Sequence, residues 1–183
     1  MWFLFRECLI GLIPNATFHD GILINSTLQI ENLDSLLKNI YGFENFRKNQ
    51  RESIESYLSE KNTLTIMKTG GGKTLIYSAA ALLSNRLTVV FSPLKSLMDD
   101  QLHSLINIGI AVVVLFVSSD QPPAIQEKIF GEIASGLIRI LFVTVEKYIK
   151  NPKFRNMLKN VDKIQGVQFV IDEVYCVLDY GHY

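Results

Sequence analysis

Three consecutive glycines at residues 70–72 constrain the fold more than any other feature of this chain, because of what flanks them. The apolar run at residues 64–67 predicts a strand, and residues 73–84 have the apolar content of a buried helix. Glycine has no Cβ, so the backbone N–H groups of such a loop can approach an anion closely. A helix beginning at Lys73 would direct its N–H groups and positive dipole end at the same point. This order predicts a phosphate-binding loop; the alternative is a glycine-rich turn that only joins strand to helix.

Short apolar runs alternate with helical segments along most of the chain. Further strands are predicted at residues 87–91, 110–116, 138–143 and 167–171, and helices at residues 33–41, 47–58, 94–108, 124–135 and 147–158. Unbroken Val, Ile and Leu runs are typical of parallel strands buried on both faces. We therefore predict an α/β P-loop domain with a mostly parallel, doubly wound sheet flanked by helices. Ligands of such domains bind beyond the carboxyl ends of the strands.

The first 30 residues have no clear periodicity. Residues 1–13 are apolar, but Arg6 and Glu7 interrupt the run. The run is also shorter than the roughly 20 residues that a membrane span needs, and we expect no membrane association. We expect an extra strand or helix packed on the domain, or a poorly defined terminus.

Bulk composition narrows the function only a little. The chain is 48% hydrophobic and 20% charged, which is typical of a globular domain. Its formal net charge is zero, so a nucleic-acid partner can be argued only from local patches. Cys8 and Cys176 match no metal-ligand spacing, and a zinc site is not expected.

Two further sequence features support nucleotide chemistry at the loop. Lys73 would reach the β- and γ-phosphates, and the hydroxyl of Thr74 would bind Mg²⁺. The strand at residues 167–171 ends in two acids: Asp172 would hold Mg²⁺ through water, and Glu173 would orient or deprotonate the attacking water. A strand that ends in Asp-Glu is common and mostly structural, but together with the loop it predicts hydrolysis of a nucleoside triphosphate.

Over residues 33–183 the chain resembles the RecQ-like DNA helicases of superfamily 2. Segments that resemble the family's motifs are the adenine-recognition motif FENFRKNQ at 43–50, motif I at 67–74, motif Ia SPLKSLMDDQ at 92–101, the segment TVE at 144–146, motif II DEVY at 172–175, and the start of the aromatic-rich loop at 176–182. Met67 stands where the strict phosphate-loop pattern has glycine, which matches the looser helicase form. The resemblance implies an extension of uncertain structure at residues 1–30 and a helicase ATP-binding domain, the first RecA-like domain, at residues 31–183.

The resemblance also implies ligands and residue roles. ATP and Mg²⁺ would be the cofactors, with Phe43 stacked on the base, Gln50 bonded to its edge and Arg47 supporting the site. The residues expected to hold the phosphates are Thr69, Gly70, Gly71, Gly72, Lys73 and Thr74. The residues expected to contact single-stranded or partly duplex DNA are Ser92, Lys95, Thr144 and Glu146.

The chain departs from the family pattern at several positions. Tyr175 replaces the motif II histidine that helps link hydrolysis to DNA binding, Val145 and Lys68 stand where proline is usual, and Tyr180 replaces a tryptophan. By the resemblance, the sequence stops before motif III, the second motor domain and its arginine finger. An arginine finger contributes roughly 10³–10⁵ in turnover. We therefore expect this chain alone to bind nucleotide, hydrolyse it slowly and unwind nothing.

A local basic stretch offers a second route to DNA. Residues 146–163 contain Lys147, Lys150, Lys153, Arg155, Lys159 and Lys163. Such lysines can bind phosphates weakly and in a salt-sensitive way, or they can form a solvated helix face. The aromatic residues near the C-terminus can stack on bases or belong to a frayed end.

Three hypotheses follow. The first is the ATP-binding motor domain of a monomeric 3′-to-5′ DNA helicase in repair, recombination or replication, in the nucleus of a eukaryote or the cytoplasm of a bacterium. The second is a non-catalytic ATP-binding or DNA-binding remnant, favoured by Tyr175 and Val145. The third is an unrelated P-loop enzyme such as a small-molecule kinase, which the segments at residues 43–50 and 92–101 argue against.

Overall fold

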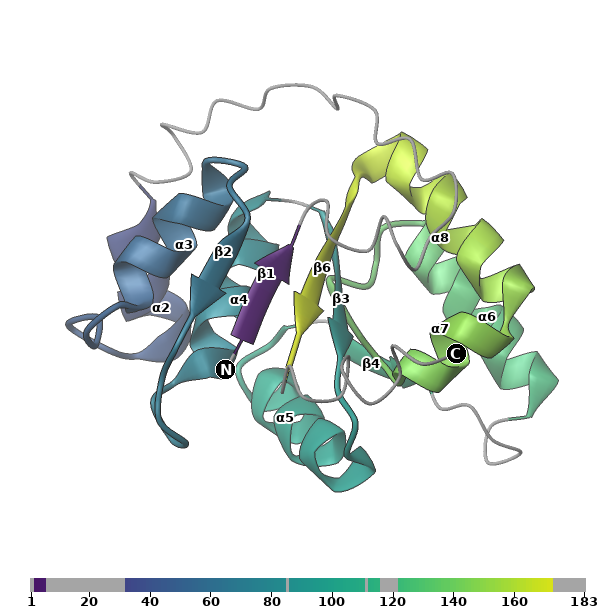
Figure 1. The fold of residues 1–183 in the computed structure, drawn as a ribbon, viewed down its shortest axis with the longest axis horizontal. Helices are drawn as coiled ribbons and strands as arrows, with labels where there is room; N and C mark the ends of the chain where they lie inside the picture. The colour runs from purple at the N-terminus through teal and green to yellow at the C-terminus, as the bar shows by residue number, and fades with distance from the viewer. Residues whose placement is uncertain (1, 6–31, 85, 111, 116–121, 173–183) are drawn as a thin grey trace.

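The computed structural model describes residues 2–5, 32–84, 86–110, 112–115 and 122–172 (Figure 1). The elements are β1 (Trp2–Phe5), α2 (Leu33–Tyr41), α3 (Gln50–Leu58), β2 (Thr63–Thr65), α4 (Lys73–Ser84), β3 (Leu87–Phe91), α5 (Lys95–Asn107), β4 (Val112–Leu115), α6 (Pro123–Ala134), β5 (Ile140–Val143), α7 (Val145–Lys150), α8 (Pro152–Gln165) and β6 (Val167–Ile171). Gly42 ends α2 in the left-handed conformation, with φ at 71°, as its place after the periodic leucines predicts.

The described strands form one sheet in the order β2-β1-β6-β3-β5-β4. Strands β3, β4, β5 and β6 pair in parallel. Strand β1 lies antiparallel between β2 and β6. The prediction of a mostly parallel sheet flanked by helices is confirmed.

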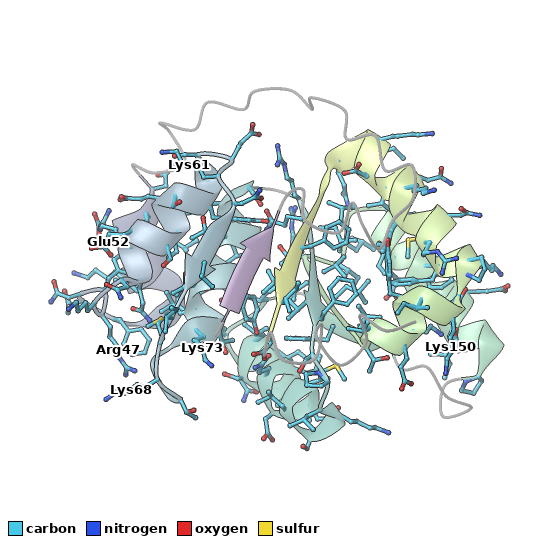
Figure 2. All side chains as sticks on the ribbon, viewed as in Figure 1. Arg47, Glu52, Lys61, Lys68, Lys73 and Lys150 are labelled. Carbon is cyan, nitrogen blue, oxygen red and sulfur yellow. The ribbon has the colours of Figure 1, made fainter. Side chains whose placement is uncertain are left out.

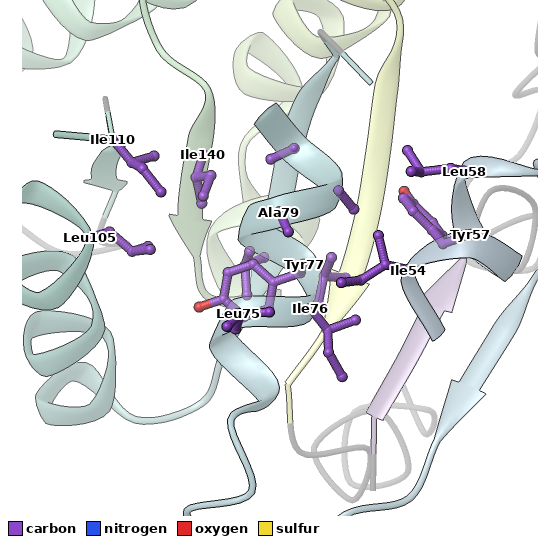
Figure 3. Packing of buried hydrophobic residues seen from close by; sticks show 14 of the residues in the cluster. Ile54, Tyr57, Leu58, Leu75, Ile76, Tyr77, Ala79, Leu105, Ile110 and Ile140 are labelled. Atoms are coloured by element: carbon purple, nitrogen blue, oxygen red, sulfur yellow. The ribbon is translucent and has the colours of Figure 1, made fainter. Parts of the chain in front are cut away.

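Two apolar cores cover the two faces of this sheet. In β3, Leu87, Val89 and Phe91 belong to one core with α6, α7 and α8, whereas Val90 belongs to the other with α2 to α5. Successive residues of a strand point to opposite faces, so a run of apolar residues serves both layers. Figure 3 shows the second core around α4, where Ile76 lies toward Ile54 of α3 and Tyr77 lies on the side of Leu105 and Ile140. Helix α4 is thus buried along most of its length.

The described part of the first 30 residues joins the sheet. Phe3 pairs with Leu64 of β2 on one side and with Ile171 of β6 on the other. The expectation of an extra strand is confirmed for Trp2–Phe5. Residues 6–31 lie outside the described part of the chain.

The prediction of a single helix at residues 147–158 is wrong. The structure has two helices, α7 and α8, which meet at Asn151 and Pro152. Proline has no N–H and disfavours a helical conformation in the residue before it. Asn151 accordingly has φ −117° and ψ 92°, and its side chain caps α8 by accepting a hydrogen bond from the N–H of Phe154 at 2.9 Å.

Several other boundaries differ by a few residues. The strand predicted at residues 64–67 is Thr63–Thr65, and the one predicted at residues 138–143 begins only at Ile140. Among the described helices, none combines the length and apolar character needed to cross a bilayer. In the same residues, no three His, Cys, Asp or Glu side chains are grouped as metal ligands.

Candidate functional site

The glycine loop leads directly into α4, which begins at Lys73 as predicted. Gly70 and Gly72 have φ values of 73° and 85°, a conformation that glycine adopts far more easily than other residues. A side chain at Gly72 would also collide with the amide of Gln50. The glycines are therefore needed for the path of this loop and for its close contact with Gln50 at the start of α3.

Two side chains of the segment at residues 43–50 bind this loop. Arg47 Nη1 donates to the carbonyl of Gly70 at 2.9 Å. Gln50 Nε2 donates to the carbonyl of Gly72 at 3.1 Å, and Gln50 Oε1 accepts from the N–H of Arg47 at 2.8 Å. Figure 2 shows Arg47, Lys68 and Lys73 at the same end of the molecule. The structure therefore brings two of the predicted adenine-recognition residues, Arg47 and Gln50, together with the predicted phosphate loop.

The direction of these carbonyls also orients the loop's N–H groups. In a trans peptide the N–H points opposite to the preceding C=O, and the described chain contains no cis peptide. Because the Gly72 carbonyl faces Gln50, the N–H of Lys73 is directed away from Gln50, at the start of α4. A helix start with this orientation suits an anionic phosphate group.

Phe43 and Gln50 differ in their accessibility. The side chain of Phe43 is 49% exposed, which suits stacking on a flat ring. Gln50 is only 3% exposed, and its amide bonds to the backbone of the loop. Its predicted contact with the edge of adenine stays a prediction, and what the structure shows is its link to the loop.

The carboxyl ends of three parallel strands meet at one edge of the sheet. Phe91 pairs with Val143 on one side and with Ile171 on the other. The next residues along the three strands are Ser92, Thr144 and Asp172. The N–H of Asp172 donates to the carbonyl of Phe91 at 2.8 Å, which fixes the acid beside the end of β3.

Asp172 is 1% exposed, and neighbouring helices hold it. Gln101 Nε2 donates to Asp172 Oδ2 at 3.1 Å, and the hydroxyl of Tyr77 donates to Gln101 Oε1 at 2.9 Å. Burial raises the pKa of Tyr77 well above its ordinary value, while a hydrogen bond with the side chain of Thr74 lowers it in part. Sequence reasoning assigned no role to Tyr77 or Gln101; the only sequence signal was that Gln101 closes the segment resembling motif Ia.

These residues fit a magnesium nucleotide. The glycine loop and the start of α4 offer N–H donors and the ammonium group of Lys73. Thr74 and Asp172 supply a hydroxyl and a carboxylate, the oxygen ligands that Mg²⁺ prefers. A carboxylate as buried as that of Asp172 is stabilised by a cation.

The residues predicted to contact DNA lie near this edge of the sheet, and their side chains differ in solvent exposure. Ser92 is 1% exposed, and its hydroxyl has no hydrogen-bond partner among the described residues. Lys95 is exposed in the first turn of α5. Thr144 caps α7 by accepting from the N–H of Lys147 at 3.2 Å, and Glu146 is half-buried. Their roles in DNA binding stay predictions.

Three of the six basic residues in this stretch bind other groups of the same domain. Lys147 is 3% exposed and donates to Gln126 Oε1 at 2.8 Å; its burial lowers its pKa. Lys153 pairs with Glu127 at 3.0 Å. Arg155 donates to the carbonyls of the last turn of α7, including that of Tyr148 at 2.8 Å. Lys150, Lys159 and Lys163 are the exposed members of the stretch that remain for an outside partner.

Several predicted residues fall outside the described part of the chain. They are Glu173, Tyr175, Cys176, Tyr180, His182 and Tyr183. The structure describes the site as far as Asp172, and the predicted role of Glu173 stays a prediction.

A protein-family comparison gives independent information on this arrangement. Residues 47–183 match the family model described as DEAD/DEAH box helicase, and this span includes the glycine loop, Gln101 and Asp172. The chain belongs to the DEAD/DEAH box helicase family. The predicted motifs at 67–74 and 172–175 therefore lie within a recognised helicase domain.

Among curated proteins, the chain is similar to RecQ helicases from bacteria, animals and plants. It is 35% identical to the ATP-dependent DNA helicase RecQ of Haemophilus influenzae, over 89% of this chain and 25% of that protein. It is 36% identical to the RecQ-like DNA helicase blm-1 of Caenorhabditis elegans, over 90% of this chain and 17% of that protein. It is 33% identical to the ATP-dependent DNA helicase Q-like 5 of Arabidopsis thaliana, over 91% of this chain and 18% of that protein. The resemblance to RecQ-like helicases is confirmed, and the chain spans about a quarter or less of these relatives.

Proposed function

We propose that this chain is the ATP-binding motor domain of a RecQ-like, ATP-dependent DNA helicase. In this proposal its cofactors are ATP and Mg²⁺. The helicase of which it is the motor domain moves 3′-to-5′ along DNA in repair, recombination or replication. Support comes from the helicase family match and from relatives whose names state ATP-dependent DNA helicase activity.

The observation that carries this proposal is the direct bonding of Arg47 and Gln50 to the glycine loop. A segment that could read adenine is thereby physically joined to one that could bind phosphates. Phosphoryl transfer to a small acceptor has no use for such a segment at residues 43–50, nor for the segment at residues 92–101. The kinase hypothesis is accordingly less well supported than the motor hypothesis.

Each residue of the site has a proposed task. Lys73 binds the β- and γ-phosphates as a point charge, and Thr74 and Asp172 hold the metal ion. When bound, Mg²⁺ neutralises charge on the phosphate oxygens. Glu173 orients the attacking water or accepts its proton. Phe43 stacks on the base.

We propose that single-stranded or partly duplex DNA crosses the edge where β3 and β5 end. Ser92, Lys95, Thr144 and Glu146 are the proposed contacts there. Ser92 is buried, so its contact requires either movement of the segment before α5 or an indirect role. We propose that the protein is a monomer that acts on DNA. Its compartment would be the nucleus of a eukaryote or the cytoplasm of a bacterium. Unwinding would need a second motor domain. A protein as long as the relatives is long enough to contain one.

A second candidate is an ATP-binding remnant without a motor cycle. Val145 favours this candidate. It stands where the family motif has proline, and it is apolar, 9% exposed and packed in the core. Tyr175 in place of the motif II histidine points the same way.

Stimulation of ATP hydrolysis by DNA separates the two candidates. We expect single-stranded DNA to raise the ATPase rate of the 183-residue chain about fivefold or more, the lower end of typical coupling between two ligand sites. Lys73→Ala is the matched control, and its rate should stay at background with or without DNA. A measurable rate that DNA leaves unchanged would favour the ATP-binding remnant.

A further inference from the structure

Gln101 joins three elements that the proposed nucleotide site uses. It lies on α5, donates to Asp172 at the end of β6 at 3.1 Å, and accepts from Tyr77 of α4 at 2.9 Å. Tyr77 and Asp172 are both buried, so water does not substitute easily for these bonds. The contacts form a bridge between the helix after the glycine loop and the acid across the sheet.

The bridge also lies beside Thr74. Thr74 and Tyr77 are three residues apart in α4, so their side chains occupy neighbouring positions on one face of the helix. Tyr77 donates to Gln101, which in turn donates to Asp172. The bridge therefore runs from the helix turn that carries Thr74 to Asp172, the other proposed metal ligand.

The amide of Gln101 suits this position better than other side chains of its size. A carboxamide donates from its nitrogen and accepts at its oxygen, so it can serve a carboxylate and a phenol at once. Glutamate would place a second negative charge beside Asp172, and leucine would leave two buried polar groups without this partner.

We propose that Gln101, supported by Tyr77, is a positioning residue that holds the Asp172 carboxylate in register with Thr74 for Mg²⁺. This inference rests on the proposed function, because it concerns the metal of the same nucleotide site. Groups that orient metal ligands typically change metal affinity about 10- to 100-fold when they are removed.

The test compares nucleotide binding at varied Mg²⁺ concentration. A fluorescent ATP analogue is titrated first with EDTA and then over a Mg²⁺ series, for the wild type, Gln101→Leu and Tyr77→Phe. We expect Gln101→Leu to raise the half-saturating Mg²⁺ concentration about tenfold. Tyr77→Phe should raise it less, and binding in EDTA should stay unchanged in both variants. A general loss of structure would weaken binding in EDTA as well.

Two controls keep the outcomes distinct. Gln165→Leu removes a glutamine at the end of α8, next to the opposite end of β6, and should leave the Mg²⁺ requirement unchanged. Circular dichroism and thermal melting check folding, and Tyr77→Phe, which removes one oxygen, carries the test if Gln101→Leu does not fold. Wild-type Mg²⁺ requirements in both variants would overturn this inference alone. A wild type that binds no analogue at any Mg²⁺ concentration would overturn the proposed function with it.

Discussion

Single side chains decide whether the glycine loop is only a turn or part of a nucleotide site. Gln50 bonds to the Gly72 carbonyl and to the N–H of Arg47, and Arg47 bonds to the Gly70 carbonyl. These bonds hold the loop on the side of Gln50. The N–H group at the start of α4 is directed to the opposite side. Nucleotide identity would then be sensed by the same residues that support the phosphate loop.

Truncation of these residues should reduce discrimination between ATP and GTP. We expect Gln50→Ala to lower the ratio of ATP to GTP affinity about fivefold, since one hydrogen bond contributes roughly 1 kcal/mol. Phe43→Ala should weaken binding of both nucleotides through lost stacking and lower the ratio less. Competition against a fluorescent analogue measures both affinities, with the exposed neighbour Lys48→Ala as control. An unchanged ratio in both variants would remove the adenine-recognition assignment.

At this scale the sequence predicts residues in local motifs better than residues that meet only in space. Lys73 at the helix start and Asp172 at the strand end follow from local patterns, and the structure places both as predicted. Gln101 reaches Asp172 from α5, and Tyr77 of α4 bonds to Gln101. No local pattern carries that convergence, because it depends on how α4 and α5 pack on the sheet.

At the scale of elements, the junction of α7 and α8 shows how one proline changes a helix. Apolar spacing continues across residues 147–158 and conceals the break, although Asn151-Pro152 is itself a break signal. Asn151 caps α8, and Arg155 bonds to carbonyls at the end of α7. Helix periodicity therefore predicted the helical content here, and the backbone limits of proline explain the error.

Loss of this cap should destabilise the domain moderately. We expect Asn151→Ala to lower stability by about 1 kcal/mol. The corresponding fall in melting temperature is about 2–4 °C for a domain of this size. Asn156→Ala is the matched control, because Asn156 is exposed in the same helix, where alanine is the better helix former. Equal melting temperatures for Asn151→Ala and the wild type would show that the cap contributes nothing.

At the scale of the whole molecule, the order of strands places the site. Strands β3, β5 and β6 end side by side, which brings Ser92, Thr144 and Asp172 to one edge. Alternating strands and helices predict a mostly parallel sheet, but the position of β1 between β2 and β6 depends on long-range pairing that no local pattern encodes. The architecture was thus predictable, and the position of the N-terminal strand within it was not.

The central claim is that the loop before α4 binds the phosphates of ATP, and Lys73 tests it most directly. Lys73 begins α4, whereas Lys68 is an exposed lysine at the start of the same loop and serves as the matched control (Figure 2). The measurement is the affinity of wild type, Lys73→Ala and Lys68→Ala for a fluorescent ATP analogue with Mg²⁺. We expect Lys73→Ala to lose at least about tenfold in affinity, since a charge-assisted bond to phosphate contributes roughly 1.5–3 kcal/mol. Lys68→Ala should bind almost as the wild type does. Wild-type affinity in Lys73→Ala would contradict the account.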